Sequence, residues 1–194
     1  MISARDVEAF EREILGGGVV VFPTDTVYGV GCSGDRPAAI ERLYDLKGRH
    51  ASTPSALMWF SKEAALEALV HLGPRTRDAV AQLLPGPVLA VVPGSEGGTL
   101  GVRVPRLTGP LEPLAAARVT VLQTSANLTG GPDPRRLGDV PESIRAGADL
   151  VLDGGELPGK PSTVVVLSSY ERGGWSLLRE GAVAEAAIAK LLGS

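Results

Sequence analysis

One stretch decides the fold: Val19-Val20-Val21-Phe22-Pro23-Thr24-Asp25-Thr26-Val27-Tyr28-Gly29-Val30-Gly31. Its first four residues are apolar on both faces of an extended chain, which is typical of a strand buried inside a sheet. Pro23 lacks a backbone N–H and ends that strand, and a short polar loop follows at 24–26. We therefore expect a buried central strand at 19–22 with a polar loop directly after it.

A helix is expected on each side of this stretch. Ser3-Ala4-Arg5-Asp6 resembles a capping box, apolar residues then recur at helical spacing, and Gly16-Gly17-Gly18 stops the helix. Downstream, Asp35 is placed to cap a second helix at its N-terminus. Lys47 and Arg49 fall at or just beyond the C-terminal end of that helix, where cations complement the helix dipole.

The rest of the chain alternates between helix-like and strand-like segments. Further helices are expected near 61–70, 74–84 and 183–192. Strands are expected at 56–60, 88–92, 100–104, 119–123, 150–152, 162–167 and 175–178. This alternation indicates an α/β fold, with a twisted mixed parallel and antiparallel sheet flanked by helices. No repeat or long linker divides the chain, so we expect a single domain over 1–194, with Gly130–Pro134 as its mobile loop.

Composition limits the class of protein. Of the 194 residues, 44% are hydrophobic and 21% charged, as in ordinary globular proteins. No apolar run approaches the roughly twenty residues that span a bilayer, and the N-terminus lacks the apolar core of a signal peptide. The one cysteine, Cys32, cannot form an internal disulfide or a zinc cluster. We therefore expect a cytoplasmic protein without membrane segments. Its net charge of −3 argues against global attraction to nucleic acid but leaves a local basic groove open.

Three short motifs suggest chemistry that their surroundings do not support. Residues 29–34 fit G-x-G-x-x-G, but no carboxylate follows about twenty residues later, and Asp35 would repel a pyrophosphate; a close-packed glycine turn is favoured. Residues 154–161 approach a P-loop, but a proline replaces the hydroxyl residue, so a turn between strands is favoured. Cys32 with His50 could suggest a thiol nucleophile. A cysteine that is simply packed in the core is the favoured interpretation.

A series of segments in a fixed order resembles one family. The series is Pro23–Gly31, Lys47-Gly48-Arg49, Pro85-Gly86-Pro87, Arg103-Val104-Pro105, Thr124-Ser125-Ala126-Asn127-Leu128, Pro161-Ser162-Thr163-Val164 and Leu177–Ala182. It resembles the YrdC-like family of threonylcarbamoyl-AMP synthases over about residues 17–183. Because the chain ends soon after Gly181, it is similar to the short members that have no extra C-terminal domain.

The resemblance implies an ATP site built from the elements K-x-R and S-x-N. Lys47 and Arg49 would meet phosphate oxygens with a compact ammonium and a planar fork, and they are the expected catalytic residues. Ser125 and Asn127 alternate along an extended segment, so both would point to one face and donate to phosphate or ribose. The implied nucleotide-binding positions are Lys47, Arg49, Thr99, Ser125, Asn127 and Arg179.

The same resemblance places the amino acid at Thr24, Arg103 and Ser162. A guanidinium suits the threonine carboxylate because it can donate two parallel hydrogen bonds. Arg103 also interrupts an apolar strand, where a charge requires a partner or a cavity. Tyr28 and Gly29 would form part of the pocket wall.

The implied activity is nucleotidyl transfer that yields L-threonylcarbamoyladenylate. The amine of L-threonine takes up CO2 or bicarbonate, the resulting carbamate attacks the α-phosphorus of ATP, and pyrophosphate leaves. Such a reaction needs positioning and charge stabilisation more than an acid–base pair. Mg²⁺ would be held mainly by the ATP phosphates, without a metal cage made by the protein. In the family the product passes to a partner enzyme that modifies the adenosine beside the tRNA anticodon.

The chain departs from the family directly after K-x-R. It reads His50-Ala51-Ser52-Thr53-Pro54-Ser55, where the family commonly has Pro, then a basic residue and Pro-Leu. Two alternatives therefore stay open beside the synthase. One is an RNA-binding module with a basic concave surface, for which Arg135-Arg136 is the local basic pair, giving a weak RNA contact. The other is a paralogue without synthase activity, which the intact K-x-R and S-x-N elements argue against.

Overall fold

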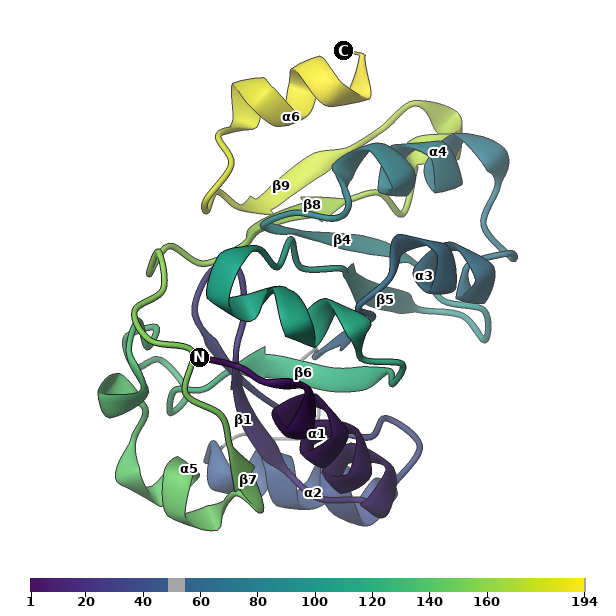
Figure 1. Cartoon of the computed structure of the whole chain (residues 1–194). Helices are drawn as coiled ribbons and strands as arrows, with labels where there is room; N and C mark the ends of the chain where they lie inside the picture. Colours follow the sequence, from purple (N-terminus) through teal and green to yellow (C-terminus); the bar gives the residue numbers. More distant parts are fainter. Residues whose placement is uncertain (49–54, 194) are drawn as a thin grey trace.

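The computed structural model describes residues 1–48 and 55–193. Within these ranges, nine strands form one sheet in the order β7-β1-β2-β6-β3-β5-β4-β8-β9. The pairs β1/β7, β3/β5 and β4/β8 are parallel and the other neighbours are antiparallel. Figure 1 shows helices flanking this sheet. The predicted α/β fold with a mixed sheet is confirmed.

The stretch from Val19 to Gly31 forms a hairpin. Strand β1 (Val20–Pro23) pairs with β2 (Tyr28–Cys32), and both are fully buried. The short strand β7 (Leu150–Val151) covers the other side of β1, so β1 is interior but second from one edge of the sheet. The G-x-G of residues 29–31 lies inside β2 and not in a turn. A Cβ on Gly31 would lie 2.5 Å from Val121 Cγ1 and 2.9 Å from the backbone oxygen of Leu122, so the predicted close approach of backbones is confirmed.

The remaining strands match the expected segments within one to two residues at most ends. They are β3 (Ala56–Met58), β4 (Val88–Pro93), β5 (Thr99–Arg103), β6 (Val121–Ser125), β8 (Thr163–Val166) and β9 (Ser176–Arg179). Parallel neighbours such as β3 and β5 are joined by long crossovers that contain helices, as parallel pairing requires.

The helices enclose two hydrophobic cores. One core packs α1 (Ala4–Gly16), α2 (Pro37–Leu46) and α5 (Glu142–Gly147) on the β1 end of the sheet. The other packs α3 (Lys62–Ala68), α4 (Pro74–Leu83) and α6 (Glu185–Leu192) against β4, β5 and β8 (Figure 1). Short 3-10 helices occupy Gly109–Ala116, Leu137–Asp139 and Tyr170–Arg172. In the described part of the chain, no helix has the length and apolar character to cross a bilayer.

The N-termini of α1 and α2 can be compared with the predicted capping residues. Ser3 caps α1 and forms a reciprocal capping box with Asp6, as predicted. The expected Asp35 cap of α2 is wrong. Arg36 is the N-cap residue and makes no side-chain cap, because Asp35 is one residue too early and its own N–H bonds Ser33 Oγ in the preceding turn.

Candidate active site

Several of the predicted site residues lie on the sheet face that the second core leaves open. On β4, β5 and β8 that core takes alternate residues such as Ala90, Val102 and Val165, while Leu89 and Val91 on the other face stay half-buried. Side chains alternate along a strand, so Thr99 and Arg103 lie on this open face. Ala56 of β3 pairs with Gly101 of β5 and with Gln123 of β6, so these three residues share a face. Ser125 lies two residues after Gln123 on β6 and therefore shares that face too.

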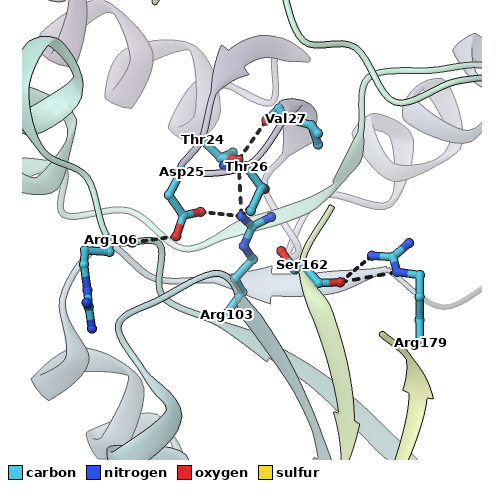
Figure 2. A network of polar contacts seen from close by, with 8 residues as sticks. All are labelled: Thr24, Asp25, Thr26, Val27, Arg103, Arg106, Ser162 and Arg179. Atoms are coloured by element: carbon cyan, nitrogen blue, oxygen red, sulfur yellow. Dashed lines mark hydrogen bonds and ion pairs between the residues drawn. The ribbon is translucent and has the colours of Figure 1, made fainter. Parts of the chain in front are cut away.

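Arg103 is the centre of a buried polar cluster. Its guanidinium donates through Nη2 to Asp25 Oδ1 at 2.5 Å, to Thr26 Oγ1 at 2.8 Å and to Thr24 Oγ1 at 3.2 Å. Figure 2 shows these acceptors on the loop between β1 and β2, which folds over the end of β5. Arg103 is only 4% exposed, so the prediction that it requires a partner is confirmed.

The loop that meets Arg103 is itself fixed by hydrogen bonds. The Thr24 hydroxyl donates to Val27 O at 2.7 Å, and the second oxygen of Asp25 accepts from Arg106 N at 2.9 Å. Thr24, which was expected to contact the amino acid, thus uses its hydroxyl within the protein. A cavity of about 230 Å³ adjoins Thr24 and Asp25, with Arg106 and Glu156 among the residues that line it.

Two buried atoms in this region have no hydrogen-bond partner among the described residues: Arg103 Nε and Ser162 Oγ. Three other buried atoms share this state, Thr76 Oγ1, Arg77 Nε and Arg145 Nε, but these belong to α4 and α5. Buried polar groups are normally satisfied, so an open N–H and an open hydroxyl in a predicted site are consistent with a bound polar ligand.

Arg179 borders the same region from β9. It donates to Ser162 O through Nη2 at 2.9 Å and Nε at 3.3 Å (Figure 2). Burial lowers the pKa of the Arg103 guanidinium, the Asp25 carboxylate opposes this shift, and the positive charge of Arg179 contributes to the lowering. Two guanidinium groups therefore act on one region, an arrangement that suits anionic ligands.

Lys47 lies at the C-cap of α2, as predicted, and is bonded to the S-x-N segment. Its Nζ donates to the backbone oxygen of Ser125, to Asn127 O at 2.6 Å and to Asn127 Oδ1 at 3.1 Å. Ser125 Oγ donates to Asn127 Oδ1 at 2.8 Å, so the two side chains do share a face. The chain bends at 126–127, however, and the expected continuous extension is wrong.

Two predicted nucleotide residues are less closely placed. Thr99 is exposed at the start of β5, the opposite end of that strand from Arg103. The strand registers put Thr99 and Ser125 at the same end of the sheet, on strands separated by β3. Arg49 and most of the His50–Ser55 departure lie outside the described residues. Of that segment, the structure describes Ser55, whose hydroxyl lies 3.2 Å from the Tyr44 hydroxyl.

Asp25 is the site residue that sequence reasoning missed. It lies within the Pro23–Gly31 segment, and the family resemblance implied no role for it. The available signal was a carboxylate flanked by threonines at the tip of a hairpin, together with an arginine in an apolar strand that needs a counter-charge.

Tyr28, which was expected in the pocket wall, is bonded through its hydroxyl to the segment 153–155. Its hydroxyl bonds Asp153 Oδ1 at 3.0 Å and Gly155 O at 2.8 Å, and burial, aided by Asp153, raises its pKa to about 12. Tyr28 is therefore a neutral structural hydrogen-bonding group at ordinary pH.

The rejected motifs keep their structural roles. Cys32 is buried, which raises its pKa to about 11 and makes it a poor nucleophile. Residues 154–161 connect β7 to β8, and Leu157 N and Gly159 N donate to Arg135 O and Thr26 O. Throughout 1–48 and 55–193 there is no group of three or more His, Cys, Asp or Glu that could hold a metal ion.

Comparison with known proteins identifies what this arrangement is similar to. Residues 12–181 match the profile of the Sua5, YciO and YrdC proteins, described as telomere recombination. A Pyrococcus abyssi protein named threonylcarbamoyl-AMP synthase is 33% identical over 97% of this chain and 57% of its own length. A Nitrosococcus oceani protein of the same name is 34% identical over 74% of this chain and 82% of its own.

A solved structure matches the fold over the whole chain. The crystal structure of P. abyssi Sua5 complexed with L-threonine superposes with a TM-score of 0.85 at 30% identity. The match covers 100% of this chain and 59% of the P. abyssi chain. The chain thus spans less than two thirds of that relative.

Proposed function

The chain belongs to the Sua5, YciO and YrdC family, and on that premise we propose that it is a threonylcarbamoyl-AMP synthase. This nucleotidyltransferase would join L-threonine, bicarbonate or CO2, and ATP, and release pyrophosphate. The observation that carries the proposal is a pair of buried atoms that have no hydrogen-bond partner among the described residues, Arg103 Nε and Ser162 Oγ. Both can donate a hydrogen bond, as an amino-acid carboxylate requires.

In this proposal Asp25, Thr24 and Thr26 hold one nitrogen of Arg103, so the guanidinium is oriented before the substrate arrives. A group fixed in advance loses less freedom when it binds a ligand. Arg179, bonded to the backbone of Ser162, contributes a second positive charge beside the amino-acid position. That charge favours the meeting of the threonine carbamate with the triphosphate.

The nucleotide would bind toward Ser125, Asn127 and Thr99, with Lys47 and Arg49 supplying positive charge and Arg179 approaching from the amino-acid side. The Ser125 hydroxyl donates to Asn127 and retains an oxygen that can accept from a ribose hydroxyl. Mg²⁺ is expected to arrive on the ATP phosphates, whose charge it would offset. Transfer of the product to a tRNA-modifying enzyme remains part of the proposal.

The RNA-binding alternative receives less support. Arg135 and Arg136, the basic pair offered for it, both form ion pairs with Glu156, at 3.0 and 2.6 Å. Their charge is therefore partly offset before any phosphate approaches.

The test is pyrophosphate release by the purified chain. We expect release from ATP only when L-threonine and bicarbonate are both present. Ser162→Ala should raise the KM for threonine and leave the KM for ATP within about twofold, since it removes one hydrogen bond to one substrate. Ser168→Ala, at an exposed serine six residues away, is the matched control.

Pyrophosphate release that does not depend on threonine, or no release at all, would refute the synthase assignment. Salt-dependent RNA binding without ATP turnover would favour the module instead.

A further inference from the structure

Lys47 is bonded to the turn after β6 through both its side chain and its backbone. Its ammonium contacts the backbone oxygens of Ser125 and Asn127 and the side-chain oxygen of Asn127. Its backbone oxygen accepts from Thr129 N and from Thr129 Oγ1, both at 3.2 Å. These contacts join segments about eighty residues apart, and Lys47 is only 3% exposed. The end of α2 and the 125–129 turn are therefore one bonded unit.

Within the part of the chain that the structure describes, three oxygens of the turn meet the three donors of the Lys47 ammonium. A lysine ammonium carries three N–H donors and no acceptor. For a phosphate oxygen to take one of these donors, one of the three oxygens would have to give up its bond to Lys47, which is unfavourable for the two backbone carbonyls.

The same bonds fix the Asn127 amide. Its Oδ1 accepts from Lys47 and from Ser125 Oγ, and its Nδ2 donates to Gly131 O at 2.7 Å. Two donors meet the oxygen and one acceptor meets the nitrogen, so the orientation of the amide is determined by its neighbours.

We propose that Lys47 is a positioning residue: its ammonium shapes the Ser125–Asn127 turn, and direct phosphate contact falls to other groups. The inference rests on the proposed function only in taking this turn to be part of the ATP site. It also accounts physically for K-x-R and S-x-N occurring together, because the lysine of the first element bonds the backbone of both polar residues of the second.

The first test compares two substitutions at Lys47. Lys47→Met keeps the length of the side chain and removes its donors, whereas Lys47→Arg keeps the positive charge but cannot place a planar fork on three converging oxygens. We expect both to weaken ATP binding in calorimetry by about tenfold or more, with Arg no better than Met within about threefold. The KM for threonine should stay within about twofold. Near-normal ATP affinity in Lys47→Arg, beside a large loss in Lys47→Met, would show a direct charge contact and overturn the inference.

The second test needs no substrate. Amide hydrogen exchange of peptides covering 125–131 should be faster in ligand-free Lys47→Met than in the natural protein, with other regions unchanged. Lys190→Met, at an exposed lysine on α6, is the control and should leave this segment as it is. Unchanged exchange in Lys47→Met overturns the inference. Because no turnover is involved, this result stands even if synthase activity is not found.

A milder variant covers the case in which Lys47→Met does not fold. Thr129→Val removes the hydroxyl that bonds Lys47 O and keeps the side-chain shape. It should accelerate exchange of the same segment to a smaller extent, and unchanged exchange would contradict the proposed positioning role of Lys47.

Discussion

The ion pair between Arg103 and Asp25 should be one of the most stability-sensitive polar contacts in the protein. The two side chains are 5% and 7% exposed and their charged atoms lie 2.5 Å apart. Asp25→Asn keeps the shape and removes the charge. Its new amide nitrogen must also face either the Arg103 guanidinium or Arg106 N, both of which are donors.

Removing one partner of a buried ion pair typically costs about 3–5 kcal/mol. The Thr24 and Thr26 hydroxyls still accept from Arg103 and soften the loss, whereas the donor left opposed at Arg106 N adds about 1 kcal/mol. We therefore expect the free energy of unfolding to fall by roughly 3–4 kcal/mol, with a decrease in Tm of roughly 10 °C for a chain of this size.

The assay is urea unfolding followed by circular dichroism. Glu142→Gln is the control, because its pair with Arg145 is more exposed, at 76% for Glu142 and 34% for Arg145, and should be worth less than about 1 kcal/mol. In an Arg103→Met background, Asp25→Asn should cost much less than in the natural protein, because the charge that Asp25 offsets is gone. A loss no larger than that of the control would refute the reasoning.

Three further predictions concern stability and reactivity. Gly31→Ala should destabilise the protein by about 1–3 kcal/mol in urea unfolding, because its Cβ would lie 2.5 Å from Val121 Cγ1. Gly138→Ala is the control and should be nearly neutral, because its Cβ would have nothing within 4 Å. Equal effects of the two substitutions would contradict the close packing at Gly31. Because the pKa of Tyr28 is raised from 10.0 to about 12, its neutral form is favoured in the folded state, and the stability this contributes is complete below pH 10 and is lost as the pH rises toward 12. Tyr28→Phe should therefore show a smaller fall in unfolding free energy over that interval, and an unchanged slope would contradict the shift. Cys32, buried and with a pKa near 11, should react with a chromogenic disulfide reagent at pH 8 only after denaturant is added; rapid reaction of the native protein would contradict its burial.

The elements could be predicted from sequence because their signals are local. Val20–Phe22 is apolar on both faces and forms a buried strand, and Ser3 and Asp6 lie at the spacing that closes a capping box. Local signals also produced the errors. Asp35 has the right chemistry for a helix cap but lies one residue too early, and the glycines at 29 and 31 indicated a turn where the partner strands require a closely packed strand.

The sequence by itself determined that an arginine at position 103 would need a partner or a cavity, because an apolar strand cannot solvate a guanidinium. Only the tertiary structure decided that the partner is Asp25, 78 residues away, since the β1–β2 hairpin and β5 meet there through the order of strands in the sheet. The same holds for Lys47. The family resemblance implied a phosphate contact, whereas the fold places three oxygens of the 125–127 turn around its ammonium. Short-range patterns specify helices and strands, but which polar groups neutralise one another depends on contacts that form only when distant segments pack together.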